Sequence, residues 1–308
     1  MRATSVGRPT ARQRLANGNA APLFGLGVLV IIWGLSVPAM KLGLESLPPF
    51  TLAALRYLAA APCFVVILLT QPAPPRRLLF GMAGLGVIGV DLGQLTQIAG
   101  IARTSAALAT VITASIPLFT VLLAVFKLGQ KLRPRHLLGF LLALGGIGGA
   151  VLGAPDALAG GGLLGIVLLL VCSVSIALYY VLGTAISFRT NALVVAAWSS
   201  LAALPGLIVI SLIELRHAPL HPSATGIGVV LYLGVFTTVA GTWLWFTGMR
   251  RLPVRIAAST QYLQPLVGVA ASAAMFGDPI GPLFGLGFAC VLGGVALASW
   301  PSRRSDQE

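Results

Sequence analysis

The sequence predicts an all-α integral membrane protein whose ten transmembrane helices form two inverted repeats of five. The first observation behind this prediction is composition: hydrophobic residues make up 57% of the 308 residues and charged residues 9%, with a mean hydropathy of +0.96. Such a chain has too few polar groups to cover a soluble surface. The other two observations are an internal repeat and an uneven distribution of positive charge between the two ends of the helices.

Ten apolar runs are long enough to cross a hydrocarbon core of about 30 Å. They form a first five-helix unit over 22–153 and a second over 162–300, joined by a linker at 154–161 and flanked by tails at 1–21 and 301–308. The short alternating runs of a membrane β-barrel are not seen. The ten predicted helices lie at 22–42, 49–70, 78–99, 104–126, 136–153, 162–186, 191–213, 225–248, 255–277 and 280–300.

Residues in the two halves match at a constant offset of 148. One offset without gaps, across the third to fifth predicted helix of each half, indicates a duplicated unit. The first two helices of each half do not match at this offset, so the duplication is argued from the other three. The matched pairs include Gly86 with Gly234, Gly93 with Gly241, Gly100 with Gly248, Pro117 with Pro265 and Gly139 with Gly287.

The basic residues fix the orientation. If the N-terminus lies inside, sixteen of the 20 basic residues fall on the inner side, Lys41, Arg103 and Arg216 fall on the outer side, and Arg56 lies within a helix. The positive-inside rule favours this arrangement. Both tails are then cytoplasmic, and five helices per half place the second half upside down relative to the first. The same rule accounts for the net charge of +13, so we expect no nucleic-acid partner.

Pro117 and Pro265 occupy matching places inside the fourth and ninth predicted helices. Each removes a backbone donor and leaves a carbonyl that lipid cannot satisfy. Paired interruptions in corresponding helices are a sequence indicator of a central binding site. We therefore expect both prolines to line a cavity, and the alternative is that the kinks only shape helix packing.

Asp91 is the only acidic residue well inside a predicted helix, about 18 Å from its inner end at 1.5 Å per residue. A charge at that depth costs about 2.5–3.5 kcal/mol, so the side chain should meet a partner or water. Gln94 lies one turn further on the same face. Asp91 is a candidate for carrying a coupling proton or contacting a substrate amine. The alternatives are an ion pair with Arg56 in the second helix, or local hydrogen bonding.

A set of aromatic and amide side chains offers stacking surfaces and neutral hydrogen bonds. Buried amides cost free energy unless they are paired, so we expect some of them to meet a ligand or a neighbouring helix. Aromatic residues in membrane helices more often serve packing or the interface, so only part of the set is expected at a cavity. The set comprises Trp33, Tyr179, Tyr180, Trp243, Trp245, Gln261, Tyr262 and Gln264.

The sequence gives no reason to expect a cofactor, a metal or a catalytic site. The G-x-G-x-x-G run at 84–89 has no preceding strand, which the dinucleotide-binding motif requires. His217 and His221 have the spacing of a helical metal pair, but Pro219 between them opposes a continuous helix. No second membrane-buried carboxylate is available to pair with Asp91 in acid–base catalysis.

Several of these residues carry a family resemblance: Trp33-Gly34, Pro38, Lys41, Arg56, Pro117 and Leu128-Gly129-Gln130 in the first half, and Ala257-Ala258, Pro265 and Phe276-Gly277-Asp278 in the second. Over 22–300 the chain resembles a ten-helix member of the drug/metabolite transporter superfamily with two EamA domains. The family usually has Glu at the places of Gln130 and Asp278. The resemblance implies that the first, third, fourth, sixth, eighth and ninth helices surround a central cavity. With Gln264 added from its place beside Pro265, the implied lining candidates are Trp33, Asp91, Gln94, Pro117, Tyr179, Trp243, Gln261, Gln264 and Pro265.

We therefore expect a secondary active transporter, acting as an exporter of small metabolites such as amino acids or related organic solutes, in a bacterial inner membrane. Its expected partners are the lipid bilayer and a small-molecule substrate. Because no nucleotide-binding motif is present, energy would come from a proton gradient acting through Asp91 or from the substrate's own gradient. The alternative is an accessory membrane subunit that binds a partner protein and transports nothing. An intramembrane enzyme is the third candidate. The oligomeric state is left open.

Overall fold

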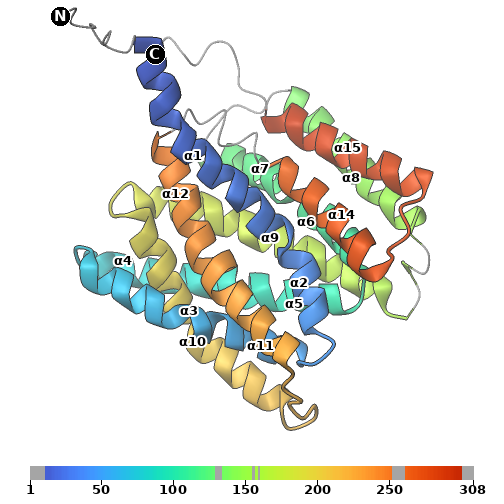
Figure 1. The fold of residues 1–308 in the computed structure, drawn as a ribbon, viewed down its shortest axis with the longest axis horizontal. Helices are drawn as coiled ribbons and strands as arrows, with labels where there is room; N and C mark the ends of the chain where they lie inside the picture. The colour runs from blue at the N-terminus through green and yellow to red at the C-terminus, as the bar shows by residue number, and fades with distance from the viewer. Residues whose placement is uncertain (1–10, 129–133, 155–156, 159, 252–260, 300–308) are drawn as a thin grey trace, which may run out of the picture.

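The computed structural model confirms the all-α membrane fold (Figure 1). In the part of the chain that it describes, nine helical segments are long and apolar enough to cross a membrane, and a shorter apolar helix, α14 (Leu263–Phe276), follows the eighth. The first part of the helix expected at 255–277 lies outside the described residues. The structure describes residues 11–128, 134–154, 157–158, 160–251 and 261–299.

Five of the expected helices are formed as continuous segments whose bounds agree with the predicted runs within a few residues. Three of them begin with a proline, which suits a first turn because the N–H that proline lacks has no partner there. The five are α3 (Pro49–Thr70), α8 (Pro134–Leu152), α9 (Gly162–Ser187), α10 (Ala192–Glu214) and α15 (Pro282–Ser299).

The first and fourth expected helices are each divided in two. A break at Leu35 separates α1 (Ala11–Gly34) from α2 (Ser36–Gly43). A turn after α6 (Ala106–Thr113) separates it from α7 (Ile116–Leu128). α1 begins at Ala11, and the apolar span formed by α1 and α2 runs from Ala21 to Gly43, close to the expected 22–42.

Pro117 and Pro265 lie at helix starts, where we had expected them to kink helix interiors. Pro117 is the second residue of α7, and Pro265 is the third residue of α14. The turn before α7 is closed by the Ser115 hydroxyl, which donates to the carbonyl of Ile112 at 2.6 Å. Pro117 therefore stands just after an interruption of the fourth helix, and Pro265 occupies the equivalent place in the second half near the start of the described helix α14, with residues 252–260 lying outside the described part of the chain.

The third and eighth expected helices each contain a π-helical segment, which the sequence did not predict. In both, the backbone N–H of a glycine bonds to the carbonyl five residues earlier, Gly93 to Ile88 and Gly241 to Phe236. These two bonds are related by the offset of 148. The elements are α4 (Arg76–Leu85), η1 (Gly86–Leu92) and α5 (Gly93–Ala102) in one helix, and α11 (Ala224–Leu231), η2 (Tyr232–Ala240) and α12 (Gly241–Arg251) in the other.

Close contacts extend the repeat to the first helices of each half. Gly100 packs against Leu169, and Gly248 packs against Leu26, so closely that neither glycine leaves room for a Cβ. Gly100 and Gly248 are 148 residues apart, whereas Leu26 and Leu169 are 143 apart. The difference of five arises because α10 is one residue longer than α3 and the connection from α10 to α11 is four residues longer than the connection from α3 to α4. A search with one ungapped offset misses this correspondence.

α8 and α15 form an antiparallel pair at one edge of the molecule (Figure 1). Gly139 near the start of α8 meets the backbone of Gly294 near the end of α15, and Gly146 meets Gly287. The offset of 148 converts each of these two contacts into the other. Small residues here let the two backbones approach closely, which is how membrane helices gain van der Waals contact without a hydrophobic driving force.

α3 and α10 are likewise antiparallel, because the end of α10 contacts the start of α3 and the residue before α10 contacts the residue after α3. The Glu214 carboxylate at the end of α10 accepts hydrogen bonds from the backbone N–H of Phe50 and Thr51 at 3.0 and 2.7 Å. At the opposite end, Asn191 before α10 donates to the side-chain oxygen of Gln71 after α3, at 2.9 Å. Glu214 also satisfies N–H groups that the first turn of a helix leaves without partners.

Candidate functional site

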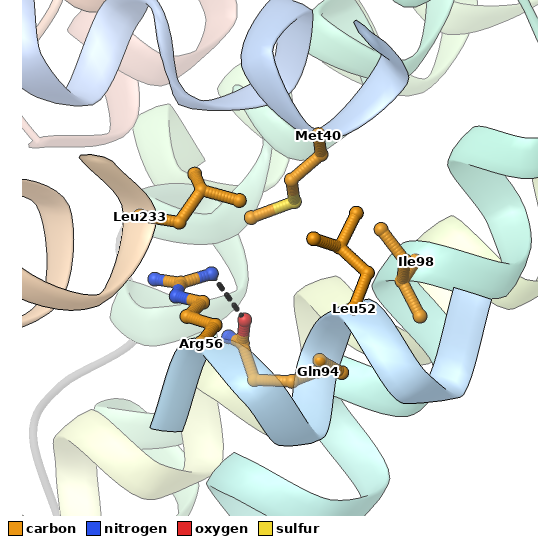
Figure 2. Close-up of a pocket in the computed structure, with 7 residues that line it drawn as sticks. Met40, Leu52, Arg56, Gln94, Ile98 and Leu233 are labelled. Carbon is orange, nitrogen blue, oxygen red and sulfur yellow. Dashed lines mark hydrogen bonds between the residues drawn. The ribbon is translucent and has the colours of Figure 1, made fainter. Parts of the chain in front are cut away.

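A small cavity lies where α2, α3, α5 and η2 meet (Figure 2). Its volume is about 10 Å³, room for about one water molecule. The site is therefore closed to any metabolite in this conformation, and a solute could enter only if the surrounding helices separated. The cavity is lined by Met40, Leu52, Ala53, Arg56, Gln94, Ile98 and Leu233.

Arg56 is the charged group of this cavity. Its side chain is 8% exposed, on the second turn of α3. Nη1 donates to Oε1 of Gln94 at 2.9 Å, as Figure 2 shows, and Nε donates to the hydroxyl of Thr238 at 2.8 Å. The guanidinium also lies 5.5 Å from the centre of the Tyr57 ring. Both hydrogen-bond acceptors are neutral.

The two π-helical segments place these acceptors. Thr238 lies in η2, and its hydroxyl donates to the carbonyl of Leu233 five residues earlier, at 2.8 Å. Its oxygen is thereby held towards α3, where Gly234 packs on the carbonyl of Arg56 itself. Gln94 is the second residue after η1. π-Bulges are rare and often occur at functional sites. Here η2 contains Thr238, and η1 lies just before Gln94, and both residues accept hydrogen bonds from Arg56.

Asp91 lies in η1, one turn before Gln94, and is not hydrogen-bonded to Arg56. Its Oδ1 is buried and has no hydrogen-bond partner in the described part of the chain. The carboxylate faces α10 at Gly206, where an added Cβ would lie 2.8 Å from Oδ2. The buried Arg56 and the half-buried Asp91 therefore contact different neighbours, Gln94 and Thr238 in one case and Gly206 in the other. In this conformation the pair considered from the sequence is not formed.

Trp33 lies at the end of α1, immediately before the break at Leu35. Its indole N–H donates to the carbonyl of Thr237 in η2 at 2.9 Å, and its ring lies 6.1 Å from that of Trp245. The indole therefore supports the π-helical segment next to Thr238. Trp243, two residues before Trp245, is 54% exposed.

Tyr179 packs on the other π-helical segment. Its ring covers Gly89 of η1 so closely that a Cβ could not be added there. Its hydroxyl lies 3.1 Å from that of Ser199 on α10, and its ring lies 5.8 Å from Tyr180. Trp33 and Tyr179 therefore hold corresponding π-helical segments in the two halves.

Gln261 and Gln264 are brought together at the start of α14, where the amide of Gln264 donates to the side-chain oxygen of Gln261. They pair with each other beside Pro265, in a region that does not line the cavity. Among the nine lining candidates predicted from the sequence, only Gln94 borders it, together with Arg56.

A second polar cluster lies at one end of the bundle. Lys41 donates to the carbonyls of Ile101 and Thr104 at 3.0 and 2.7 Å, and Asp278 accepts from the backbone N–H of Ala107 at 2.8 Å. Lys41 therefore caps the end of α5, and Asp278 caps the start of α6, each with the charge that suits that helix end. Gln130, which corresponds to Asp278 at the offset of 148, lies outside the described residues.

Thr238 is the site residue that sequence reasoning missed. It has no special spacing, and threonine within an apolar run is usually a packing residue that bonds to its own helix. A signal was present: Arg56 needs acceptors deep in the membrane, and the hydroxyls of 237–238 are among the few polar groups of the eighth helix. The π-helical turn that aims Thr238 could not be foreseen from the residues.

Comparison with known proteins gives a consistent result. The EamA-like transporter family model matches twice, at residues 22–152 and 163–300. The chain is 29% identical over 287 residues to YedA of Escherichia coli (strain K12), named an uncharacterized inner membrane transporter, covering 90% of each chain. It is 28% identical over 281 residues to a probable amino-acid metabolite efflux pump of the same strain, covering 88% of this chain and 92% of the relative.

The fold has also been seen in a crystal structure. That structure has a TM-score of 0.64 and 22% sequence identity to this chain, and covers 91% of this chain and 98% of its own. At this identity the likeness concerns the fold alone. Because the family model matches most of both halves, the chain belongs to the EamA-like transporter family of the drug/metabolite transporter superfamily, and it is a transporter and not an enzyme.

Proposed function

We propose that this protein is a secondary active exporter of small metabolites such as amino acids or related organic solutes, working by alternating access in a bacterial inner membrane. The relative named as an amino-acid metabolite efflux pump supports this substrate class and direction. The closed cavity around Arg56 supports a site that is sealed between openings, because about 10 Å³ cannot hold a metabolite.

The two halves act as inverted five-helix repeats, residues 22–153 and 162–300, with both termini in the cytoplasm. The antiparallel α8–α15 pair supports this arrangement, because its two glycine contacts exchange when the halves are exchanged, and α3 and α10 are antiparallel as the arrangement requires. Rocking of one repeat against the other would expose the Arg56 cavity to each side in turn. The break at Leu35 and the turn before Pro117 provide hinge points for this movement.

Asp91 carries the coupling proton. The observation that carries this assignment is its buried Oδ1 without a hydrogen-bond partner. A buried carboxylate oxygen without a donor is costly when ionised, so a bound proton, or water admitted by an opening movement, would stabilise it. Its place in a π-helical segment, one turn from a residue of the cavity, couples its protonation to the geometry around Arg56.

The test is transport in proteoliposomes under an imposed pH gradient. Asp91→Asn keeps the size and polarity of the side chain and removes the titration. We expect the variant to exchange substrate across the membrane but to lose the stimulation by the gradient. Exposed Glu45 provides the matched control, and Glu45→Gln should respond like the wild type. A full response of the Asp91 variant to the gradient would show that coupling resides elsewhere.

A further inference from the structure

Within the described residues, Arg56 is a buried cation that no carboxylate contacts. Its side chain is 8% exposed, and in this part of the chain its hydrogen bonds reach Gln94 and Thr238. Asp91, the counter-charge considered from the sequence, faces Gly206 on α10 and is not hydrogen-bonded to Arg56. A buried ion is costly unless a counter-charge and hydrogen bonds compensate it. The two neutral acceptors supply hydrogen bonds but no charge.

The surroundings of Arg56 suit one kind of ligand. Its guanidinium borders the cavity, and the apolar side chains of the wall surround it: Leu233 lies beside Arg56, Leu52 and Ile98 lie together on the opposite side, and Met40 lies between them (Figure 2). A planar guanidinium matches a carboxylate with two parallel hydrogen bonds, which a neutral amide cannot reproduce. The site therefore combines an anion-binding group with an apolar wall.

The corresponding place in the other half is neutral. The offset of 143 that relates α3 to α10 aligns Arg56 with Ser199, whose hydroxyl bonds within α10 and to Tyr179. The offset of 148 aligns Thr238 with Val90. The two halves thus share a backbone arrangement, but of these corresponding positions only that of Arg56 carries a charge. A residue that served helix packing alone would not need this charge, whereas a residue that recognises a ligand would.

We propose that Arg56 binds the carboxylate of the transported solute, with the solute's apolar part against Met40, Ile98 and Leu233. This assignment rests on the proposed transport function. When the helices separate, the carboxylate takes the place of Gln94 on Nη1, and the return of Gln94 to Arg56 closes the empty site. The substrate class is therefore a monocarboxylate with an apolar body, including amino acids with apolar side chains, and excludes amines that lack a carboxylate.

The experiment compares the culture medium of cells that express the wild type, Arg56→Gln, Arg56→Lys or no transporter, by untargeted mass spectrometry. Arg216→Gln, which removes an exposed arginine in the turn after α10 that does not line this cavity, is the control. We expect compounds enriched by the wild type to carry a carboxylate. Enrichment should fall at least tenfold in Arg56→Gln, fall less in Arg56→Lys, which keeps the charge but not the fork, and stay unchanged in Arg216→Gln.

A second measurement does not depend on the folding of a variant. In wild-type proteoliposomes, transport of the most enriched compound is competed with that compound itself and with its primary carboxamide. We expect the carboxamide to inhibit at least tenfold more weakly. Equal inhibition, enriched compounds without a carboxylate, or full export by folded Arg56→Gln would overturn the proposal. Medium identical with and without the wild-type protein would instead count against transport, and this inference would fall with it.

Discussion

Arg56 donates from Nη1 to the side-chain oxygen of Gln94, 2.9 Å away, and so joins α3 to α5 across the wall of the closed cavity. The donor is ionised and the acceptor is a neutral amide, so the bond lacks the attraction between opposite charges that a carboxylate would add. A carboxylate could also accept two parallel hydrogen bonds from the guanidinium. The chemistry of the residue at position 94 therefore sets how readily Arg56 is released.

Gln94→Glu should lock this contact. A carboxylate at the same place would neutralise Arg56 permanently and compete with the solute, so we expect transport to fall at least tenfold while the melting temperature stays equal or rises. Gln94→Leu removes the acceptor without adding charge. It should lower stability by about 1–3 kcal/mol, because a buried donor loses its partner. Transport assays and thermal melts on both variants check this, and wild-type transport by Gln94→Glu would contradict it.

The glycines of α8 offer a matched pair for testing helix packing. An added Cβ at Gly146 would lie 2.6 Å from the carbonyl oxygen of Gly287, whereas one at Gly148 meets nothing within 4 Å. We expect Gly146→Ala to cost about 1–3 kcal/mol through overpacking. Gly148→Ala should be neutral or slightly stabilising, because alanine favours helix over glycine by up to about 1 kcal/mol. Thermal unfolding in detergent measures both, and equal shifts would show that the α8–α15 contact is looser than described.

The number and kind of helices were predictable because about 20 apolar residues have few alternatives in a membrane. The breaks and π-helical segments were not, because they depend on contacts between halves, such as that of Gly234 with the carbonyl of Arg56. The sequence does contain a sign of the offset of 143 between the first helices of the two halves. Pro62 within α3 and Pro205 within α10 are 143 residues apart. A comparison restricted to one offset could not find it.

The site was predicted less well than the fold. Burial depth singled out Asp91 and Arg56 correctly as unusual, but depth along a helix does not give the direction of a side chain. Arg56 is bonded to Gln94 and Thr238, while Asp91 faces α10. Two opposite charges within the membrane suggest an ion pair between Arg56 and Asp91. The π-helical turns, which the sequence does not predict, determine which neighbours the two side chains contact.

Glu214 should act as a stabilising cap across the α3–α10 contact. Its carboxylate accepts from the backbone N–H of Phe50 and Thr51 and from the Thr51 hydroxyl, at 2.7 to 3.0 Å. Glu214→Ala leaves these donors at the start of α3 without their acceptor, so we expect a loss of about 1–2 kcal/mol. Exposed Glu45 is the control, and its alanine variant should melt like the wild type. Thermal unfolding of both variants provides the comparison.

The proposed orientation can be tested with single cysteines in a background without the native ones. Ala73, after α3, and His217, after α10, are both exposed and lie at opposite ends of the antiparallel pair. We expect His217→Cys to react with a membrane-impermeant maleimide in intact cells, and Ala73→Cys to react only after permeabilisation. The reverse pattern would invert the protein in the membrane, and labelling of both from outside would contradict the antiparallel arrangement of α3 and α10.

Gly206 should matter for coupling more than for stability. A Cβ at this position would lie 2.8 and 3.0 Å from the two carboxylate oxygens of Asp91. These atoms are the free end of a rotatable side chain, so Gly206→Ala should turn the carboxylate away without disturbing the backbone, and its melting temperature should not fall. Because the site of protonation then moves, we expect the stimulation of transport by a pH gradient to drop severalfold while exchange without a gradient persists. Gly183→Ala, where the nearest atom is 3.7 Å away, is the control. Equal stimulation in both variants would show that the place of Asp91 against α10 is irrelevant to coupling.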